Sequence, residues 1–223
     1  MISLICSHIL PLLLSPLEKR GEGKRCSFIS IEGIDGCGKT TISEFICEWL
    51  DSKGFDVIYT VEPTTTWIGD CVERGFSEPV SAFTEALLFM ADRAEHSLQI
   101  RKWISEGKIV ISDRYIDSTL AYQGASLQGE GLKNAVEWLK DASAPYILAP
   151  DITVFLGVEP AVSLQRISNR SGKTKFESLD FLIEVDRIYR DLSKAEERFR
   201  IVDASQPLDR VKRDVIKILE SEI

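Results

Sequence analysis

Residues Ile31–Thr41 read IEGIDGCGKTT, a stretch with three glycines, one lysine and two adjacent threonines. Within it, Gly33–Thr40 match the pattern G-x-x-x-x-G-K-[ST] at every fixed position. An apolar run expected to be a buried strand precedes the stretch, and a helical pattern follows it. A glycine-rich loop in that setting turns consecutive backbone N–H groups toward phosphate oxygens, and the helix N-terminus adds partial positive charge. The stretch therefore predicts a loop that binds a nucleotide polyphosphate.

Individual roles follow from the chemistry of this loop. Lys39 is expected to bring a full positive charge to the β and γ phosphates, and Thr40 to offer an oxygen to Mg²⁺. Phosphates repel the carboxylate of Asp35, so we expect it to hydrogen-bond a sugar hydroxyl of a second substrate or to hold Mg²⁺ through water; the alternative is a turn-stabilising role. The predicted nucleotide contacts are Gly33, Ile34, Asp35, Gly36, Cys37, Gly38, Lys39, Thr40 and Thr41.

The composition narrows the class of protein. The chain has 223 residues and a net charge of −8, so nucleic acid is not an expected partner. Its five cysteines form no C-x-x-C pair, which favours free thiols in a reducing, cytoplasmic setting. Residues 1–26 are too proline-broken for a membrane span and lack the charge order of a signal peptide. We expect them to form a poorly ordered extension before a core domain at 27–223.

Apolar patterning predicts alternating strands and helices. The expected strands are 26–32, 56–61, 108–112, 152–156 and 199–202; the expected helices are 39–53, a short one ending at 75, 79–106, 129–142, 160–168, one ending near 196, and 207–220. Such alternation predicts a five-stranded parallel sheet covered by helices on both faces. Ligands bind such sheets beyond the carboxyl ends of the strands.

A second informative loop, DRYIDSTLAYQ at residues 113–123, follows the expected third strand. Asp113 stands at the strand end, which suits a second Mg²⁺ ligand. Arg114 has forked donors that can bridge an acceptor phosphate and the transferred group. The alternative for this acid–base pair is a surface ion pair.

These two loops, Glu62-Pro63, the run FMADR at 89–93 and Val202-Asp-Ala occur in the order and spacing of thymidylate kinases, so residues 27–223 resemble that family. The resemblance implies a three-layer α/β P-loop NTPase fold with a small lid. It also implies transfer of a phosphoryl group from ATP to dTMP with Mg²⁺, and a homodimer. The acceptor is a phosphate oxygen, largely ionised at neutral pH, so no strong base is needed. The two histidines, His8 and His96, adjoin no motif, which agrees.

The resemblance also implies an acceptor site. Phe89 would stack on thymine, Arg93 would meet O4, Gln123 would meet N3–H, and Tyr122 would crowd a 2′-hydroxyl. Arg74 lies one residue from the family position that holds the dTMP phosphate. The helical periodicity of apolar residues, taken alone, predicts that Phe89 is a core residue. The expected dTMP contacts are Asp35, Arg74, Phe89, Arg93, Arg114, Tyr122 and Gln123.

A lid is expected at residues 166–177. The variable positions of the phosphate loop hold no basic residue, which resembles family members that supply a mobile cation from the lid. Arg170 is the first candidate for contact with the transferring phosphate and Lys173 the second. Arg166 is expected on adenine or on the phosphates. The alternative is a solvated basic loop. The expected catalytic residues are Lys39, Arg114 and Arg170.

Three other functions fit parts of the pattern. The nearest is another pyrimidine nucleoside monophosphate kinase or deoxynucleoside kinase. A GTPase switch would carry the guanine motif Asn-Lys-x-Asp, which the sequence lacks. A regulatory nucleotide-binding protein without activity would not need the intact Lys39, Thr40, Asp113 and Arg114.

Overall fold

The computed structural model describes residues 26–167 and 178–223. The predicted N-terminal extension, except for Cys26, lies outside the described residues. So does most of the predicted lid, including its candidate cations Arg170 and Lys173.

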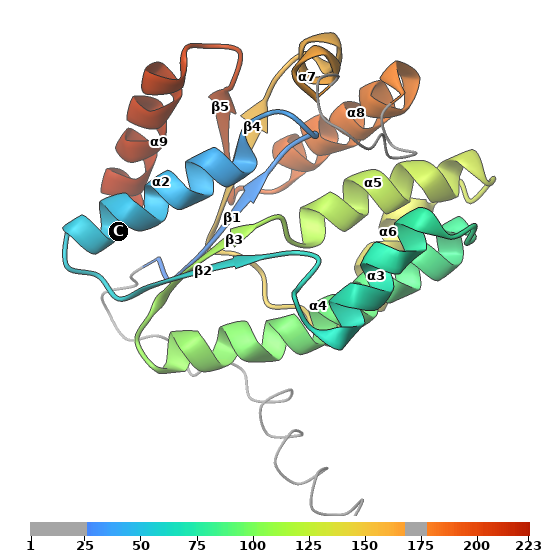
Figure 1. Cartoon of the computed structure of the whole chain (residues 1–223), viewed down its shortest axis with the longest axis horizontal. Helices are drawn as coiled ribbons and strands as arrows, with labels where there is room; N and C mark the ends of the chain where they lie inside the picture. Colours follow the sequence, from blue (N-terminus) through green and yellow to red (C-terminus); the bar gives the residue numbers. More distant parts are fainter. Residues whose placement is uncertain (1–25, 168–177) are drawn as a thin grey trace, which may run out of the picture.

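A single parallel sheet forms the centre of the molecule (Figure 1). Its strands are β1 (Phe28–Glu32), β2 (Val57–Val61), β3 (Ile109–Asp113), β4 (Ile152–Gly157) and β5 (Phe199–Asp203). They lie in the order β2-β3-β1-β4-β5, and every pairing is parallel. All residues of β1 and β3 are buried, as strands covered on both faces must be. The predicted five-stranded parallel sheet is confirmed.

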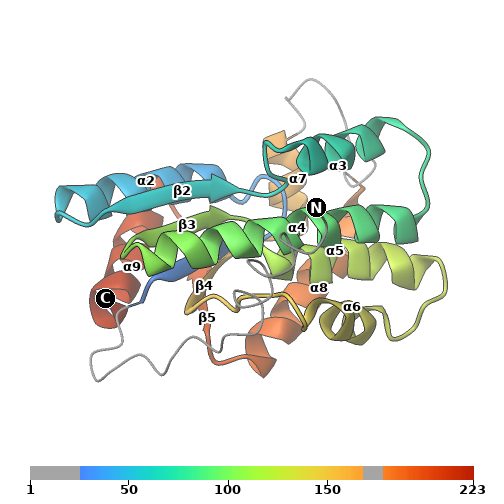
Figure 2. The same cartoon turned by 90° about the horizontal axis from the view of Figure 1, so that it is seen from below.

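Helices cover both faces and complete the three predicted layers (Figures 1 and 2). Helices α2 and α9 contact one face; α4 and α8 contact the other, with α5 between them. The helices are α2 (Lys39–Ser52), α3 (Trp67–Ser77), α4 (Ala82–Ser105), α5 (Ile116–Gly129), α6 (Ala135–Ser143), α7 (Pro160–Ile167), α8 (Leu179–Ala195) and α9 (Leu208–Glu222). Thr66 caps the N-terminus of α3, because its hydroxyl accepts a hydrogen bond from the N–H of Gly69.

Helix α5 corrects the sequence analysis, which placed a loop at 113–123 and one helix at 129–142. The structure has a helix at 116–129 and begins α6 only at Ala135. Residues 116–125 are all buried, polar side chains included. A helix enclosed on every side has no apolar stripe, so its sequence shows no helical period.

The first three strands deliver acidic residues to one end of the sheet. Glu32 ends β1, Glu62 follows β2, and Asp113 ends β3. The register pairs Asp113 with Ile31 of β1 and with Val61 of β2, so the carboxyl ends of these strands lie at one level. The loops that leave this end build the candidate site.

Candidate nucleotide-binding site

The loop after β1 has the backbone that a phosphate cradle requires. Gly36 and Gly38 have φ angles of 83° and 102°, in the left-handed region that favours glycine. A Cβ on Gly36 would lie 2.8 Å from the carbonyl oxygen of Ser163, so no larger residue fits there. Gly38 is also the N-cap of α2, which turns the helix N-terminus toward the concave side of the loop.

Lys39 sits inside this cradle. Its Nζ donates hydrogen bonds to the carbonyl oxygens of Gly33 at 2.9 Å and Ile34 at 3.0 Å, and lies 3.8 Å from a carboxylate oxygen of Asp35. The side chain is buried. The positive charge is therefore held by the loop's own oxygens, from which it can turn to phosphate oxygens.

A pair of oxygen ligands lies beside the loop. The hydroxyl of Thr40 donates a 2.6 Å hydrogen bond to Oδ2 of Asp113, which the end of β3 presents. The phenol of Tyr59 lies 3.5 Å from the same carboxylate oxygen. A hydroxyl and a carboxylate on neighbouring elements are hard oxygen donors, which fit Mg²⁺. The two residues predicted to hold the metal are thus brought together.

Arg114 faces the loop from the second motif. It has a φ of 71°, unusual for a residue other than glycine, and its guanidinium forms an ion pair with Asp35. Burial raises the pKa of Asp35, but the charges of Arg114 and Lys39 outweigh it and lower that pKa to about 2. Asp35 is therefore a fixed negative charge between two cations, and it orients the guanidinium.

These residues line one pocket of about 210 Å³ over the strand ends. The lining residues are Asp35, Gly36, Gly38, Lys39, Thr40, Thr41, Val61, Asp113 and Arg114. The side chains of two further predicted contacts, Ile34 and Cys37, are buried in the core beneath the loop, and their predicted contacts with the nucleotide are through the backbone. Burial raises the pKa of the Cys37 thiol, which is a packing group here.

Two further predicted residues brace the loop. The hydroxyl of Tyr122 accepts a 2.8 Å hydrogen bond from the N–H of Asp35, and its ring lies 5.4 Å from the guanidinium carbon of Arg114. Arg166 donates to the carbonyl oxygens of Ala204 at 3.1 Å and Gly36 at 3.5 Å. Arg166 therefore joins α7, the phosphate loop and the Val202–Ala204 motif.

Arg93 lies in a buried polar cluster between α4 and the strand ends. Its Nε donates to Oε2 of Glu62 at 2.8 Å, and its Nη1 donates to the hydroxyl of Thr119 at 2.7 Å. Its Nη2 donates to the same Glu62 oxygen and to the carbonyl of Tyr115. The Glu-Pro motif after β2 thus holds the arginine of the FMADR motif.

The other predicted acceptor residues lie on three helices. Gln123 of α5 is buried, and its Nε2 donates to Oε1 of Glu85 at 3.0 Å. Phe89 of α4 is half-buried, with its ring centroid 6.0 Å from that of Phe76. Arg74 of α3 is 73% exposed and pairs with Glu78. Neither Arg74 nor Glu78 is among the residues that line the pocket over the strand ends.

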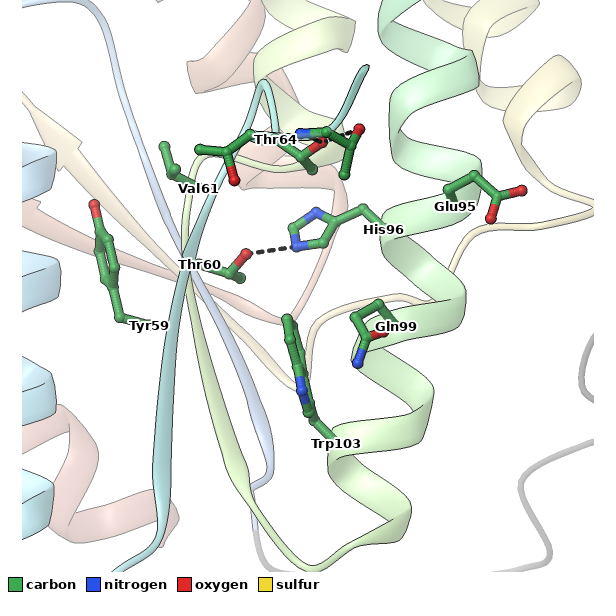
Figure 3. A pocket seen from close by; sticks show the side chains of 10 residues that line it. Tyr59, Thr60, Val61, Thr64, Glu95, His96, Gln99 and Trp103 are labelled. Atoms are coloured by element: carbon green, nitrogen blue, oxygen red, sulfur yellow. Dashed lines mark hydrogen bonds between the residues drawn. The ribbon is translucent and has the colours of Figure 1, made fainter. Parts of the chain in front are cut away.

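A larger pocket, of about 640 Å³, lies between β2 and α4 (Figure 3). Its wall includes His96, whose Nε2 is 2.7 Å from the hydroxyl of Thr60 and whose Nδ1 is 2.8 Å from Oε1 of Glu62. Trp103 and Gln99 of α4 line it further along that helix. The expectation that His96 stands apart from the motifs is wrong, because Glu62 joins it to Arg93.

Glu32 was missed by the sequence analysis, although it directly precedes the phosphate loop. Its carboxylate accepts hydrogen bonds from the N–H of Tyr115 at 2.8 Å, the hydroxyl of Ser118 at 2.7 Å and the hydroxyl of Tyr189 at 2.9 Å. Complete burial, reinforced by the negative charge of Asp117, raises its pKa to about 7. The sequence did contain a signal for Glu32, because an acidic residue at the end of an otherwise apolar strand is unusual.

Comparison with known proteins gives consistent matches. A sequence model described as thymidylate kinase matches residues 31–215. A probable thymidylate kinase of Methanococcoides burtonii is 41% identical over 198 residues, covering 87% of this chain and 96% of that protein. One from Thermococcus onnurineus is 40% identical, covering 88% and 98%. A thymidylate kinase of Bifidobacterium longum is 37% identical, covering 82% and 92%.

The described residues also bear on the expectation about membranes. None of their helices combines the length and the apolar composition needed to cross a bilayer.

Proposed function

This chain belongs to the thymidylate kinase family, and from that premise we propose how its residues phosphorylate dTMP to dTDP. The observation that carries the proposal is the placement of Lys39 and Arg114 on two facing loops, both within 4 Å of the carboxylate of Asp35. Two fixed cations over one pocket suit two phosphorylated substrates that must approach each other.

We propose ATP as the phosphoryl donor. Its polyphosphate would lie on the backbone N–H groups of the loop and the N-terminus of α2, and Lys39 would turn from the carbonyls of Gly33 and Ile34 to the β and γ phosphates. Arg166 would border the nucleotide where it now bonds Gly36 and Ala204.

Thr40 and Asp113 would hold Mg²⁺, because their paired oxygens are the hard donors that this ion prefers. When bound, the ion would neutralise negative charge that develops on the phosphate oxygens.

The acceptor dTMP would bind against α4 and α5. Arg114 would hold its phosphate with the forked guanidinium, kept in place by Asp35. Phe89 would stack on thymine, and Tyr122 would border the sugar. Four N–H groups of Arg93 are used in hydrogen bonds to Glu62, Thr119 and Tyr115. The fifth, on Nη1, would donate to thymine O4.

In the transfer step, an oxygen of the dTMP phosphate forms a bond to the γ-phosphorus of ATP. The bond from that phosphorus to the β–γ bridging oxygen breaks, and ADP leaves. The acceptor oxygen is already ionised at neutral pH, so no proton need be removed. Lys39 and Arg114 reduce the repulsion between the two anions, and alignment supplies much of the remaining acceleration. Arg170 and Lys173, outside the described residues, stay predicted as further cations.

The experiment is an ADP-release assay with purified protein, ATP and Mg²⁺. The acceptors compared are dTMP, dUMP, UMP and dCMP, and the control is Lys39→Ala. We expect release to depend on the acceptor, with dTMP the best substrate. Release that is equally fast without any acceptor, or fastest with dCMP, would contradict the proposal.

We also propose a homodimer and a cytoplasmic location. Phe83 and Leu87, one turn apart on α4, are 41% and 55% exposed, and such apolar side chains suit contact with a second copy. Light scattering after size exclusion would show a dimer, which Leu87→Glu should weaken. Cys37, Cys47 and Cys71 are free thiols, as a reducing compartment favours.

A further inference from the structure

Glu85 and Gln123 face each other across the contact between α4 and α5. Both side chains are 1% exposed, and they are joined by the 3.0 Å hydrogen bond from Nε2 of Gln123 to Oε1 of Glu85. Burial of a carboxylate is costly, so its presence at this position calls for a role beyond packing.

The hydrogen bond fixes which way the amide of Gln123 points. A side-chain amide has a donating NH₂ end and an accepting oxygen end, and Oε1 of Glu85 accepts from the NH₂ end of Gln123. The NH₂ group must therefore turn toward Glu85, and Oε1 of Gln123 must turn away from it. That oxygen is buried and has no hydrogen-bond partner among the described residues. A buried acceptor without a partner is rare in folded proteins and points to a ligand that donates.

The position of the pair agrees with the proposed acceptor site, on which this inference rests. Glu85, Phe89 and Arg93 succeed one another at intervals of four residues and so lie on the same face of α4. Gln123 comes from α5, which packs against α4. A pyrimidine stacked on Phe89 would present its edge to polar groups of both helices.

We propose that Glu85 is a positioning residue that selects the base by fixing the Gln123 amide. With the NH₂ group held by Glu85, Oε1 accepts a hydrogen bond from N3–H of thymine. Cytosine has a lone pair at N3 in place of a hydrogen, so N3 of cytosine and Oε1 of Gln123 would both be acceptors and would repel each other. The carboxylate of Glu85 thus excludes cytosine without touching the base.

The first test is Glu85→Gln, which keeps the side-chain shape. An amide at position 85 can donate as well as accept, so it permits both orientations of the Gln123 amide. We expect the ratio of kcat/KM for dTMP to that for dCMP to fall about tenfold or more. The loss with dTMP should lie mainly in KM. The matched control is Glu95→Gln, an exposed acid on the same helix, which should leave the ratio unchanged. An unchanged ratio in Glu85→Gln would overturn the proposal.

A double variant tests the role of Glu85 even if Glu85→Gln alone folds poorly. The exchange Glu85→Gln with Gln123→Glu preserves one donor and one carboxylate across the pair. The amide at position 85 then donates to the carboxylate at position 123, whose other oxygen can still accept from N3–H. We expect this exchange to restore the preference for dTMP over dCMP; failure to restore it in a folded, active protein would refute the role of Glu85.

Failure of the inference about Glu85 can be told apart from failure of the proposed function. If wild-type protein shows no dTMP-dependent release of ADP, the acceptor site itself is wrong, and the role of Glu85 falls with it. If wild type prefers dTMP and Glu85→Gln keeps the same ratio, only the positioning role is wrong.

Discussion

Replacement of Glu32 by glutamine tests whether a buried carboxylate beneath the phosphate loop carries a stability cost. Glu32→Gln keeps the shape of the side chain. The new amide can accept from the N–H of Tyr115 through its oxygen and donate to the hydroxyls of Ser118 and Tyr189, whose protons can rotate. The substitution therefore removes the ability to ionise while preserving the hydrogen bonds.

The magnitude follows from the pKa of Glu32, which burial raises from its ordinary value of 4.5 to about 7. Between these values the folded protein holds a proton that the unfolded chain has lost, so the contribution of Glu32 to stability falls as pH rises. Each pKa unit corresponds to about 1.4 kcal/mol, so the full cost above pH 7 is roughly 3 kcal/mol. We expect Glu32→Gln to gain stability relative to wild type by roughly 2–3 kcal/mol between pH 5 and pH 8.

The assay is urea unfolding of both proteins at several pH values, followed by circular dichroism. With a typical urea dependence, the wild-type midpoint should fall relative to the variant by roughly 1 M over this range. Glu48→Gln, at an exposed acid on α2, is the control and should follow wild type. Parallel pH curves for wild type and Glu32→Gln would refute the reasoning, because they would mean that Glu32 ionises as it does in the unfolded chain.

Three further predictions concern Lys39 and two side chains that face the phosphate loop, Arg114 and Tyr122. Lys39→Ala should lower kcat by about a thousandfold, because it removes a cation aimed at the transferred group, while circular dichroism shows an intact fold; retained turnover would contradict its role. Arg114→Lys should raise KM for dTMP and lower kcat, because the ammonium of lysine is a point charge and cannot form the forked contact. Steady-state kinetics would measure both constants, and values equal to those of wild type would contradict the role of Arg114. Tyr122→Phe should lower stability by about 1–3 kcal/mol in thermal unfolding, because the N–H of Asp35 loses its buried acceptor; an unchanged melting temperature would mean that another group takes the bond.

The buried polar cluster around Arg93 shows what the sequence motifs reveal about the site and what they leave out. The family resemblance implied that the FMADR run contacts the base, but it gave no role to Glu62, which bonds both Arg93 and His96. The three residues lie far apart along the chain or on different turns of a helix, so no spacing rule links them. Only the packing of α4 against the end of β2 brings one carboxylate within reach of both side chains.

Local chemistry by itself determined the phosphate loop. Two glycines, a lysine and a threonine at fixed spacing, between an apolar strand and a helix, are enough to predict the course of the loop and its ligand. The alternation of strands and helices likewise determined the parallel sheet, and with it the edge at which Asp113 and Arg114 appear.

Tertiary structure alone decided how the buried polar groups pair. Helix α5 is enclosed on every side, so its sequence carries no periodic signal, and the partners of Ser118, Thr119 and Gln123 come from other elements. Which oxygen of a buried amide or acid stays open to a ligand depends on those partners. A polar group that loses its water on burial must pair with the groups that surround it in the folded protein, and the linear sequence does not show which groups those are.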